Sequence, residues 1–373
     1  MVQHGLEGIA VAETTLSDID GENGQLRIAG FPVEKLAPQA SYEEALFLLF
    51  HDRLPDRTEL RTIRAELAQR REITPAVETL LQEAASEGRP AMDALRMGVA
   101  AADLGDESDS PTETAKRVIA VMPTIVATYW RYRQGKAPIE PDPELGHAAN
   151  YLWMLTGEQP DEAAVEGFET YLVTVIDHGL NASTFTARTV VSTESDLVSA
   201  ATAAVGTLKG PLHGGAPGPV LEMLREIHAN GDPENHVAET LDAGDRLMGF
   251  GHRVYDVRDP RAAVLSTAAE QFYETAADDA FFQTALDFEK TATELLAAYK
   301  PDQTLATNVE FYTAVLLHGV GIPADLFTPT FAIARAGGWM AHALEQLDNN
   351  RLVRPVSEYV GERNREWTPL DER

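Results

Sequence analysis

The sequence predicts a mainly α-helical fold, and three observations carry this prediction. After about residue 40, apolar residues recur at three- and four-residue spacing along most of the chain. Helix-start signals precede several of these stretches, and proline or glycine follows them. Strands do not alternate with helices, and the sequence lacks the phosphate-binding glycine loops of nucleotide-binding α/β folds. The length of 373 residues suits two or three domains.

The first forty residues predict a small β-hairpin arm. Two short apolar stretches, residues 5–12 and 24–30, flank the run 20–24, which is Asp-Gly-Glu-Asn-Gly. Aspartate, asparagine and glycine favour tight turns because they hydrogen-bond locally or adopt positive φ. We therefore expect a hairpin to precede the helices.

The helices begin where the capping residues indicate. Ser41 and Glu44 form a capping box before an apolar run, and Thr74-Pro75 places proline in a first helical turn. The remaining helices are expected over 114–135, 146–156, 161–177, 195–208, 217–229, 234–244, 260–276, 280–299, 309–319 and 328–348.

The charge of the chain is strongly unbalanced. It has 59 acidic and 30 basic residues, a formal net charge of −29. Such a polyanion repels nucleic acid and anionic membranes, so we expect neither as a partner. Lysine occurs only at Lys35, Lys116, Lys136, Lys209, Lys290 and Lys300. An acidic, lysine-poor chain indicates a halophilic protein, because concentrated salt screens its self-repulsion; the alternative is an ordinary acidic protein.

Several classes of protein are disfavoured by what the sequence lacks. There is no cysteine, which excludes disulfides, thiolate metal sites and a cysteine nucleophile. No signal-peptide pattern is recognisable, and no uncharged apolar segment reaches bilayer length. We therefore expect a cytoplasmic protein.

Three histidines lie in glycine-containing junctions between helices. His178 lies in segment 177–183, His213 in 209–219 and His252 in 248–255. Glycine permits positive φ and close backbone approach to a ligand, and loops on a rigid scaffold commonly carry chemistry. A single histidine of this kind more often satisfies a backbone carbonyl, but three similar loops favour a site. Their spacing matches no helical metal-binding pair, so we expect no metal.

Arginines gather in the later part of the chain. They are Arg258, Arg261, Arg335, Arg351 and Arg354. Guanidinium groups bind carboxylates as two-pronged forks, which suits a di- or tricarboxylate substrate. Surface ion pairs with the many acidic residues are the alternative for each arginine alone.

Together these segments resemble the citrate synthase family, in order along nearly the whole chain. The form is the short one of archaea and many bacteria, without the N-terminal regulatory domain of some longer members. The matching motifs are Gly5-Leu-Glu-Gly with Asp18-Ile-Asp-Gly, His147-Ala-Ala-Asn-Tyr-Leu-Trp-Met-Leu, Asp177-His-Gly-Leu-Asn-Ala-Ser-Thr-Phe, Gly210-Pro-Leu-His-Gly-Gly-Ala, Gly249-Phe-Gly-His-Arg-Val-Tyr with Asp259-Pro-Arg, Arg335-Ala-Gly-Gly-Trp-Met-Ala-His and Arg354-Pro.

The resemblance implies an all-helical homodimer with two domains in each subunit. The large domain would comprise residues 1–215 and 322–373, and the small domain 216–321. The small domain would close over bound oxaloacetate, with hinges near 214–219 and 319–321.

The resemblance also implies the reaction, in which an acyltransferase condenses the methyl carbon of acetyl-CoA with the keto carbon of oxaloacetate. Hydrolysis of the thioester then yields citrate and CoA, and no cofactor is needed besides acetyl-CoA as substrate. His213 would donate a hydrogen bond to the thioester oxygen, and His252 would polarise the keto group. The residues implied for oxaloacetate are His178, Arg261, Arg335 and the partner subunit's Arg354. Those implied for CoA are Leu247, Met248, Gly249, Gly251, Arg258 and Asn308.

One position differs from the family pattern. The base is usually the aspartate of an Asn-Val-Asp run, whereas this chain has Asn308-Val309-Glu310. The extra methylene moves the carboxylate by about 1.5 Å unless the backbone compensates, and a misplacement of ~1 Å can cost about 10²-fold in rate.

Two other functions remain open. The first is 2-methylcitrate synthase, which uses propionyl-CoA, because one methylene in an apolar pocket changes discrimination by only about 1–3 kcal/mol. The second is a non-catalytic relative that binds CoA or dicarboxylates, for which Glu310 is the only supporting feature.

Overall fold

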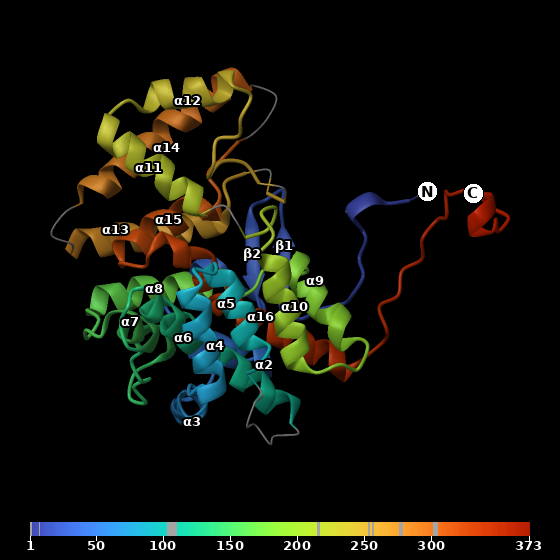
Figure 1. Ribbon diagram of the computed structural model, residues 1–373. Coiled ribbons are helices and arrows are strands. Elements are labelled where there is room, and N and C mark those ends of the chain that lie inside the picture. The colour runs from blue at the N-terminus through green and yellow to red at the C-terminus, as the bar shows by residue number, and fades with distance from the viewer. Residues whose placement is uncertain are drawn as a thin grey trace.

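The computed structural model describes residues 2–6, 8–102, 110–214, 217–252, 254–255, 257–275, 279–300 and 305–373. Helices dominate these residues, which confirms the mainly α fold (Figure 1). The α-helices are α1 (Val33–Leu36), α2 (Tyr42–His51), α3 (Arg57–Ala68), α4 (Pro75–Ser86), α5 (Ala91–Val99), α6 (Pro111–Arg133), α7 (His147–Thr156), α8 (Glu162–Val175), α9 (Ala182–Val191), α10 (Leu197–Leu208), α11 (Pro217–Asn230), α12 (Pro233–Asp242), α13 (Pro260–Thr275), α14 (Ala280–Tyr299), α15 (Val309–Gly319) and α16 (Phe327–Asp348). Short 3-10 helices are η1 (His4–Leu6), η2 (Ala324–Leu326) and η3 (Leu370–Glu372).

The predicted hairpin is present, but its first strand lies later than expected. Strand β1 (Ser17–Asp20) pairs antiparallel with β2 (Gln25–Ile28), and β3 (Phe31–Pro32) extends the sheet. The Asp20 carboxylate accepts a hydrogen bond from the Asn23 amide at 3.0 Å, which closes the turn. Within the predicted strand 5–12, residues Gly5 and Leu6 have positive φ, which is incompatible with an extended strand.

The predicted helix starts agree with the structure. Ser41 and Glu44 form the capping box of α2, and the Thr74 side chain caps α4. Four helices, α1, α3, α5 and α9, fall outside the predicted ranges. Helix α9 is rich in threonine and valine, which are weak helix formers, so its packing against α10 and α16 contributes to its helical form.

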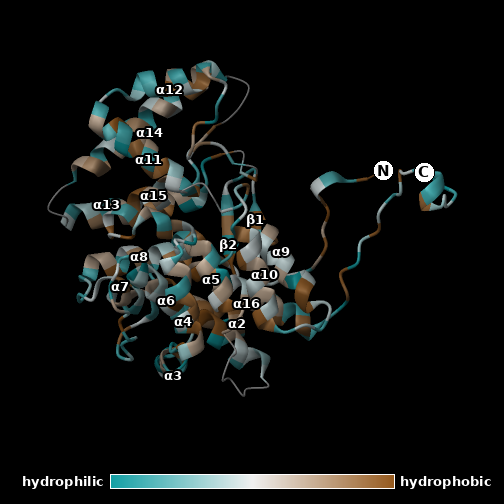
Figure 2. Cartoon of the chain, viewed as in Figure 1, coloured by the Kyte–Doolittle hydropathy of each residue, from teal (hydrophilic) through white to brown (hydrophobic). Residues whose placement is uncertain are grey.

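Helices α6 and α16 form the centre of the large group of helices. Both are apolar around most of their circumference, and Figure 2 shows brown segments of α16 and α2 in this interior. Gly338 allows α16 to approach the end of α8 closely, because a Cβ there would lie 2.4 Å from the Ile176 carbonyl oxygen. The contact brings the side chains of α16 against the His178 loop.

A second group of helices, α11 to α15, lies at the upper left of Figure 1. Helix α15 packs against α11 and α13, and α12 packs against α14. Helix α13 also packs against α8 of the large group, so the two groups meet along α8 and α13. Its helices fall within residues 216–321, the range predicted for the small domain, and the predicted boundary between residues 215 and 216 lies outside the described residues.

The terminal segments extend away from the helical body (Figure 1). After α16 the chain is almost entirely exposed as far as Arg373, and its apolar side chains are exposed with it. Val356 is 98% exposed and Trp367 is 81% exposed. Within the described part of the chain, no helix is both long and apolar enough to cross a membrane.

Candidate active site

The junctions that carry the predicted residues converge where the two groups of helices meet. His178 follows α8 of the large group, and His252 lies in the loop before α13 of the second group. Their ring centroids are 6.0 Å apart, and Tyr255 contacts both rings. The Tyr255 hydroxyl lies 3.0 Å from His178 Nε2. Burial, with the charges of Arg261 and Arg335, lowers the pKa of His178 well below its usual value, so the ring is neutral at pH 7.

Arg261 is held rigidly in the first turn of α13. Its Nε and Nη2 donate to the two oxygens of Asp259 at 3.0 and 2.8 Å, and both residues are buried. Asp259 Oδ2 also accepts from the Val309 amide at 3.2 Å, at the start of α15. One carboxylate therefore fixes a guanidinium and the helix that carries Glu310.

Arg335 enters the site from α16. Its Nε donates to the Val175 carbonyl oxygen at 2.7 Å, and the guanidinium lies 4.6 Å from the centre of the Phe331 ring. Its Nη2 is buried and has no hydrogen-bond partner among the described residues. Burial lowers the pKa of Arg335 to about 10, so it remains charged at pH 7. A buried cation with a free donor is suited to bind a carboxylate.

Glu310 lies in the first turn of α15. The Asn308 side chain caps this helix by accepting from the Glu310 amide at 3.0 Å. The Glu310 Oε2 atom is buried, and no group in the described part of the chain forms a hydrogen bond with it. Burial raises the pKa of Glu310 to about 7, although Arg261 and Arg335 oppose this rise. A carboxylate with such a pKa can take up a proton near neutral pH.

The hydrogen bonds of His252 define its tautomer. Its Nδ1 accepts from the backbone amides of Val254 and Tyr255 at 2.9 and 3.2 Å, and an amide can only donate. Burial, with the charge of Arg261, lowers the pKa of His252 to about 4, so the neutral ring carries its proton on Nε2. Arg261 Nη2 lies 3.3 Å from this Nε2 and is also a donor, so the two nitrogens do not bond to each other and both can donate to a ligand oxygen.

His213 has the opposite tautomer. Its Nε2 accepts from the Ser183 amide at 3.3 Å and lies 2.8 Å from the Ser183 hydroxyl, which in turn accepts from Trp339 Nε1. Burial, with the charge of Arg335, lowers the pKa of His213 to about 4. The neutral ring therefore carries its proton on Nδ1, which is available to a ligand.

A buried network supports the His178 loop from behind. Asp177 Oδ2 lies 3.1 Å from His342 Nε2, and His342 Nδ1 lies 3.0 Å from Arg188 Nη1. Arg188 also pairs with Glu345 at 2.5 Å, and Glu345 accepts from the Thr15 amide of the N-terminal arm. These bonds join α9, α16 and the arm to the residue preceding His178.

The segment implied for CoA includes residues 247–251, called the strap below. It packs against the residues that precede α15. Gly251 donates from its amide to the Ala306 carbonyl, and Gly249 and Gly251 accept from Asn308 through their carbonyls. Both glycines have positive φ, and Leu247 is buried while Met248 is half-buried. Arg258 is committed to another partner, because its Nη2 donates to Glu289 at 3.0 Å.

Arg354 is not brought to the other predicted residues within this chain. It lies exposed in the segment after α16, and the preceding Val353 amide donates to the Ser192 hydroxyl just beyond the end of α9. Ser183, which contacts His213, lies near the start of that helix, about 13 Å away at 1.5 Å per residue.

Comparison with known proteins decides the family. The sequence model described as "Citrate synthase, C-terminal domain" matches residues 5–356. A citrate synthase of Haloferax volcanii is 46% identical, over 100% of this chain and 99% of the relative. The chain belongs to the citrate synthase family. The family predicted from the motifs is therefore confirmed, and the chain is an enzyme, a citrate-forming transferase.

Two further members of the family bear on the substrates. The solved citrate synthase of Thermoplasma acidophilum, a ternary complex with carboxymethyl coenzyme A and oxaloacetate, is 29% identical with a TM-score of 0.90, over 100% of both chains. A 2-methylcitrate synthase of Mycobacterium tuberculosis is 38% identical over 98% of this chain and 92% of the relative.

Several residues that lie at or around the site were not predicted from the sequence. Tyr255, Asp259 and Ser183 lie inside the matched motifs, so their positions beside histidine and arginine could have been noticed. Tyr171 and Arg188 lie on helix faces, where no local signal separates them from packing residues.

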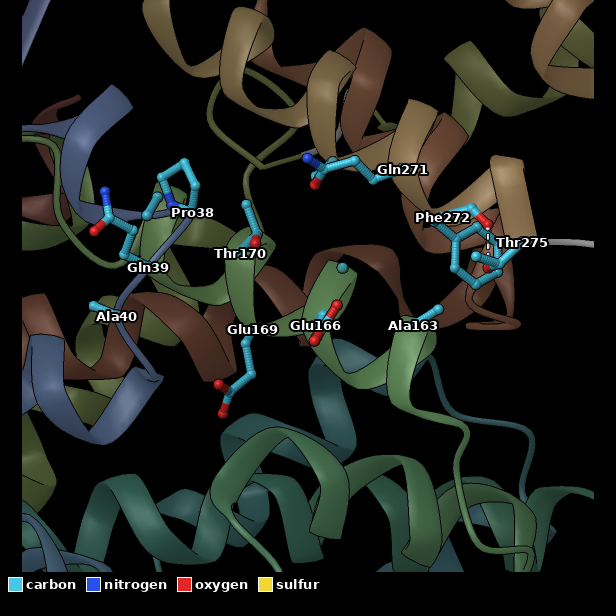
Figure 3. A pocket seen from close by; sticks show the side chains of 13 residues that line it. Pro38, Gln39, Ala40, Ala163, Glu166, Glu169, Thr170, Gln271, Phe272 and Thr275 are labelled. Carbon is cyan, nitrogen blue, oxygen red and sulfur yellow. Dashed lines mark hydrogen bonds between the residues drawn. The ribbon is translucent and has the colours of Figure 1, made fainter.

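Two other features lie around the family site. A cavity of about 340 Å³, shown in Figure 3, is lined by residues 37–40 and by side chains of α8 and α13, including Glu166, Glu169 and Gln271. It lies between the two groups of helices and includes none of the predicted catalytic residues. No group of three or more histidine or acidic side chains in the described ranges is arranged to hold a metal ion.

Proposed function

We propose that this chain makes citrate by condensing acetyl-CoA with oxaloacetate at the junction of α8, α13, α15 and α16. The proposal rests on a set of buried polar groups that gather at this junction and lack hydrogen-bond partners among the described residues. Glu310 Oε2 and Arg335 Nη2 are both buried and unpartnered, beside the paired rings of His178 and His252. A buried polar group without a partner costs about 1–3 kcal/mol, which a bound substrate offsets.

Oxaloacetate has two carboxylates and a keto group, and each has a counterpart here. Arg261 and Arg335 bind the carboxylates, and the fixed orientation of Arg261 against Asp259 reduces the entropy lost on binding. The His178 ring lies 6.0 Å from that of His252, whose Nε2 lies 3.3 Å from Arg261 Nη2. His252 donates to the keto oxygen and later supplies its proton, which turns that oxygen into the hydroxyl of citrate.

The acyl-CoA is activated by two groups that act together. Glu310 takes a proton from the methyl group, and the Nδ1–H of His213 donates to the thioester oxygen as it becomes an enolate. A pKa near 7 suits Glu310 because it is deprotonated in a useful fraction of molecules yet is a stronger base than an exposed carboxylate. The methylene carbon then attacks the polarised keto carbon, and water cleaves the resulting thioester to release citrate and CoA.

The strap of residues 247–251 holds the CoA, with Asn308 behind it. Its positive-φ glycines leave backbone groups free of side chains on one side, which suits recognition of a flat base. Arg258 forms a half-exposed ion pair with Glu289. When CoA binds, Arg258 leaves Glu289 and pairs with the CoA phosphates instead. Acetyl-CoA is consumed as substrate, and no cofactor takes part.

Closure of the small domain, residues 216–321, over the large domain completes this site. His178 and Arg335 belong to the large domain, whereas His252, Arg261 and Glu310 belong to the small one. Gly321, with φ of 89°, follows α15 and is suited to the hinge, together with the glycine-containing segment 214–219. Closure excludes water while the enolate forms.

The protein acts as a homodimer in the cytoplasm, with Arg354 completing the partner's site. The support is the exposed tail after α16, which carries Arg354 and bare apolar side chains such as Val356 and Trp367. A second subunit would cover this surface. The charge of −29 and the similarity to the Haloferax volcanii protein support a halophilic enzyme.

A thiol-release assay tests the function directly. In molar KCl, CoA release with oxaloacetate should be faster with acetyl-CoA than with propionyl-CoA, and the product should be citrate. A preference for propionyl-CoA would make the chain a 2-methylcitrate synthase, as in the Mycobacterium tuberculosis relative. Lack of release with either would contradict the proposal.

The melting temperature should rise from dilute buffer to molar KCl; a flat response would contradict the halophilic assignment.

A further inference from the structure

Tyr171 has a buried hydroxyl that neither the fold nor the mechanism above uses. The side chain lies in α8, is 0% exposed, and its hydroxyl has no hydrogen-bond partner within the ranges that the structure describes. The neighbouring buried Tyr151 differs, because its hydroxyl lies 3.1 Å from the Thr330 hydroxyl. Both rings stack on Phe168, so the two tyrosines share an environment and differ in hydrogen bonding.

The packing of α8 on α15 places Tyr171 on the approach to the site. Gly167 faces Leu316, since a Cβ on Gly167 would lie 3.3 Å from the Leu316 side chain. The site lies beyond the C-terminal end of α8 and at the N-terminal end of α15, so the two helices run antiparallel past each other. Tyr171 is about one helical turn nearer the site than Gly167 and on the same face of α8, whereas Glu310 is less than two turns nearer than Leu316 and about 120° around α15 from it.

The charges around the hydroxyl agree with this position. Burial raises the pKa of Tyr171 well above its usual value, and the charge of Glu310 raises it further while that of Arg335 lowers it. Glu310 faces Arg261, Asp259 and Arg335 from the other elements around it. Among these buried groups, Glu310 Oε2, Arg335 Nη2 and the Tyr171 hydroxyl all lack partners. Arg335 is engaged by substrate carboxylate in the proposed mechanism, which leaves the acceptor Oε2 and the donor hydroxyl.

We propose that, on domain closure, the Tyr171 hydroxyl donates a hydrogen bond to Glu310 Oε2 and orients this carboxylate toward the methyl group of the acyl-CoA. The inference rests on the proposed role of Glu310 as the base. Tyr171 is then a positioning residue that acts through Glu310.

Glutamate at position 310 has a particular need for such a contact. It has one more rotatable bond than aspartate, and fixing that torsion costs conformational entropy. A neutral phenol donates to the carboxylate without forming an ion pair, so it orients the base while leaving it basic. A hydrogen bond to the charged form also lowers the pKa of a carboxylate, which keeps Glu310 deprotonated at neutral pH when oxaloacetate occupies the arginines.

The test compares Tyr171→Phe with the matched control Tyr151→Phe in the full-length protein. Tyr171→Phe should lower kcat about 10- to 100-fold, the size expected for a hydrogen bond to a charged group, with KM for oxaloacetate unchanged. The acid limb of its kcat–pH profile should move to higher pH by about one unit, because the base loses a bond that favours its charged form. Its melting temperature should not fall, since the deleted hydroxyl has no partner. Tyr151→Phe should lower the melting temperature and leave the pH profile unchanged.

Three results would overturn the proposal. They are an unchanged kcat and pH profile in Tyr171→Phe, a higher KM for oxaloacetate with an unchanged profile, or a fall in melting temperature as large as that of Tyr151→Phe. The second would mean that Tyr171 binds substrate, and the third that it is structural. A double-mutant cycle with Glu310→Asp adds a check: the shorter acid does not reach the hydroxyl, so Tyr171→Phe should have little further effect.

Failure of this inference is distinguishable from failure of the base assignment. If Glu310→Gln is inactive and Tyr171→Phe is normal, only the inference is wrong. If Glu310→Gln is active, the assignment of the base is wrong and the inference falls with it.

Discussion

Two buried polar clusters meet on α16 and differ in how fully their atoms are bonded. The support cluster consists of Asp177, Arg188, His342 and Glu345, and its members bond to one another. The substrate cluster consists of Tyr171, Arg261, Glu310 and Arg335 and keeps a hydroxyl, a carboxylate oxygen and a guanidinium nitrogen unpartnered. Asp177 Oδ1 is the exception in the support cluster.

We infer that the difference separates atoms that hold the backbone from atoms that bind a ligand. Burying a polar atom without a partner costs about 1–3 kcal/mol, so a folded protein keeps such atoms mainly where function requires them. In the support cluster only Asp177 Oδ1 carries such a cost among the described residues, and the cluster fixes the loop before His178. We expect mutations in the first cluster to act on stability and those in the second on catalysis.

The largest effect is expected at Glu310. Glu310→Gln should lower kcat by about 10²- to 10⁴-fold, because an amide has the size of the carboxylate but cannot accept the proton. The melting temperature should not fall, since the change removes a buried carboxyl that has an unpartnered oxygen. Steady-state kinetics and thermal unfolding measure both quantities. Glu345→Gln, the matched change in the support cluster, should instead lower the melting temperature; near-normal turnover in Glu310→Gln would contradict the comparison.

Arg354 tests whether the substrate cluster is complete within one chain. Arg354→Ala and Arg335→Ala homodimers should both be nearly inactive. A mixed dimer contains one site with neither change, so random mixing of equal amounts should restore about a quarter of the wild-type activity. Absence of recovery in dimers shown to be mixed by mass would remove Arg354 from the partner's site.

Paired arginine substitutions compare the two clusters on stability. Arg188→Met removes the partner of Glu345 Oε2 and of the buried His342 Nδ1 and should destabilise the fold by about 1–3 kcal/mol. Arg335→Met removes a cation with a free nitrogen and should cost far less, while greatly raising KM for oxaloacetate. Denaturant unfolding in molar KCl measures the difference. Equal destabilisation by both substitutions would show that Arg335 is chiefly structural.

The smallest effect is expected at Glu169, which belongs to neither cluster. Its substitution should change only how the stability of the fold depends on pH. Burial, with the charge of Glu43, raises the pKa of its carboxyl to about 8. The folded state then binds a proton that the unfolded state releases above its lower pKa, so stability falls as pH rises from about 4.5 to 8. Glu169→Gln should flatten this dependence and raise the melting temperature by a few degrees at pH 8. Glu166→Gln, which removes an exposed carboxylate on the same helix, should leave the slope unchanged; the same slope in both variants would contradict the shift.

Features that depend on residues close together in the sequence, such as helix starts, were predicted well. The caps at Ser41 and Thr74 and the range of α14 agree with the structure, because a helix start depends on hydrogen bonds between residues three or four apart. The strand predicted at 5–12 was wrong because its apolar residues have no neighbour to pair with, while the residues after them do. Helix α9 was missed because part of its stability comes from packing against α10 and α16.

The sequence by itself determined the residue types of the chemistry and the glycine loops that present them, since those loops need particular backbone angles that few residues allow. Tertiary structure decided which atoms remain unpartnered. The unpartnered atoms of Tyr171, Glu310 and Arg335 come from three helices far apart in the chain, and only their packing shows that none of the described residues bonds to these atoms. Burial also moves the pKa of Glu310 to about 7, and it depends on every neighbour at once, which no local pattern encodes.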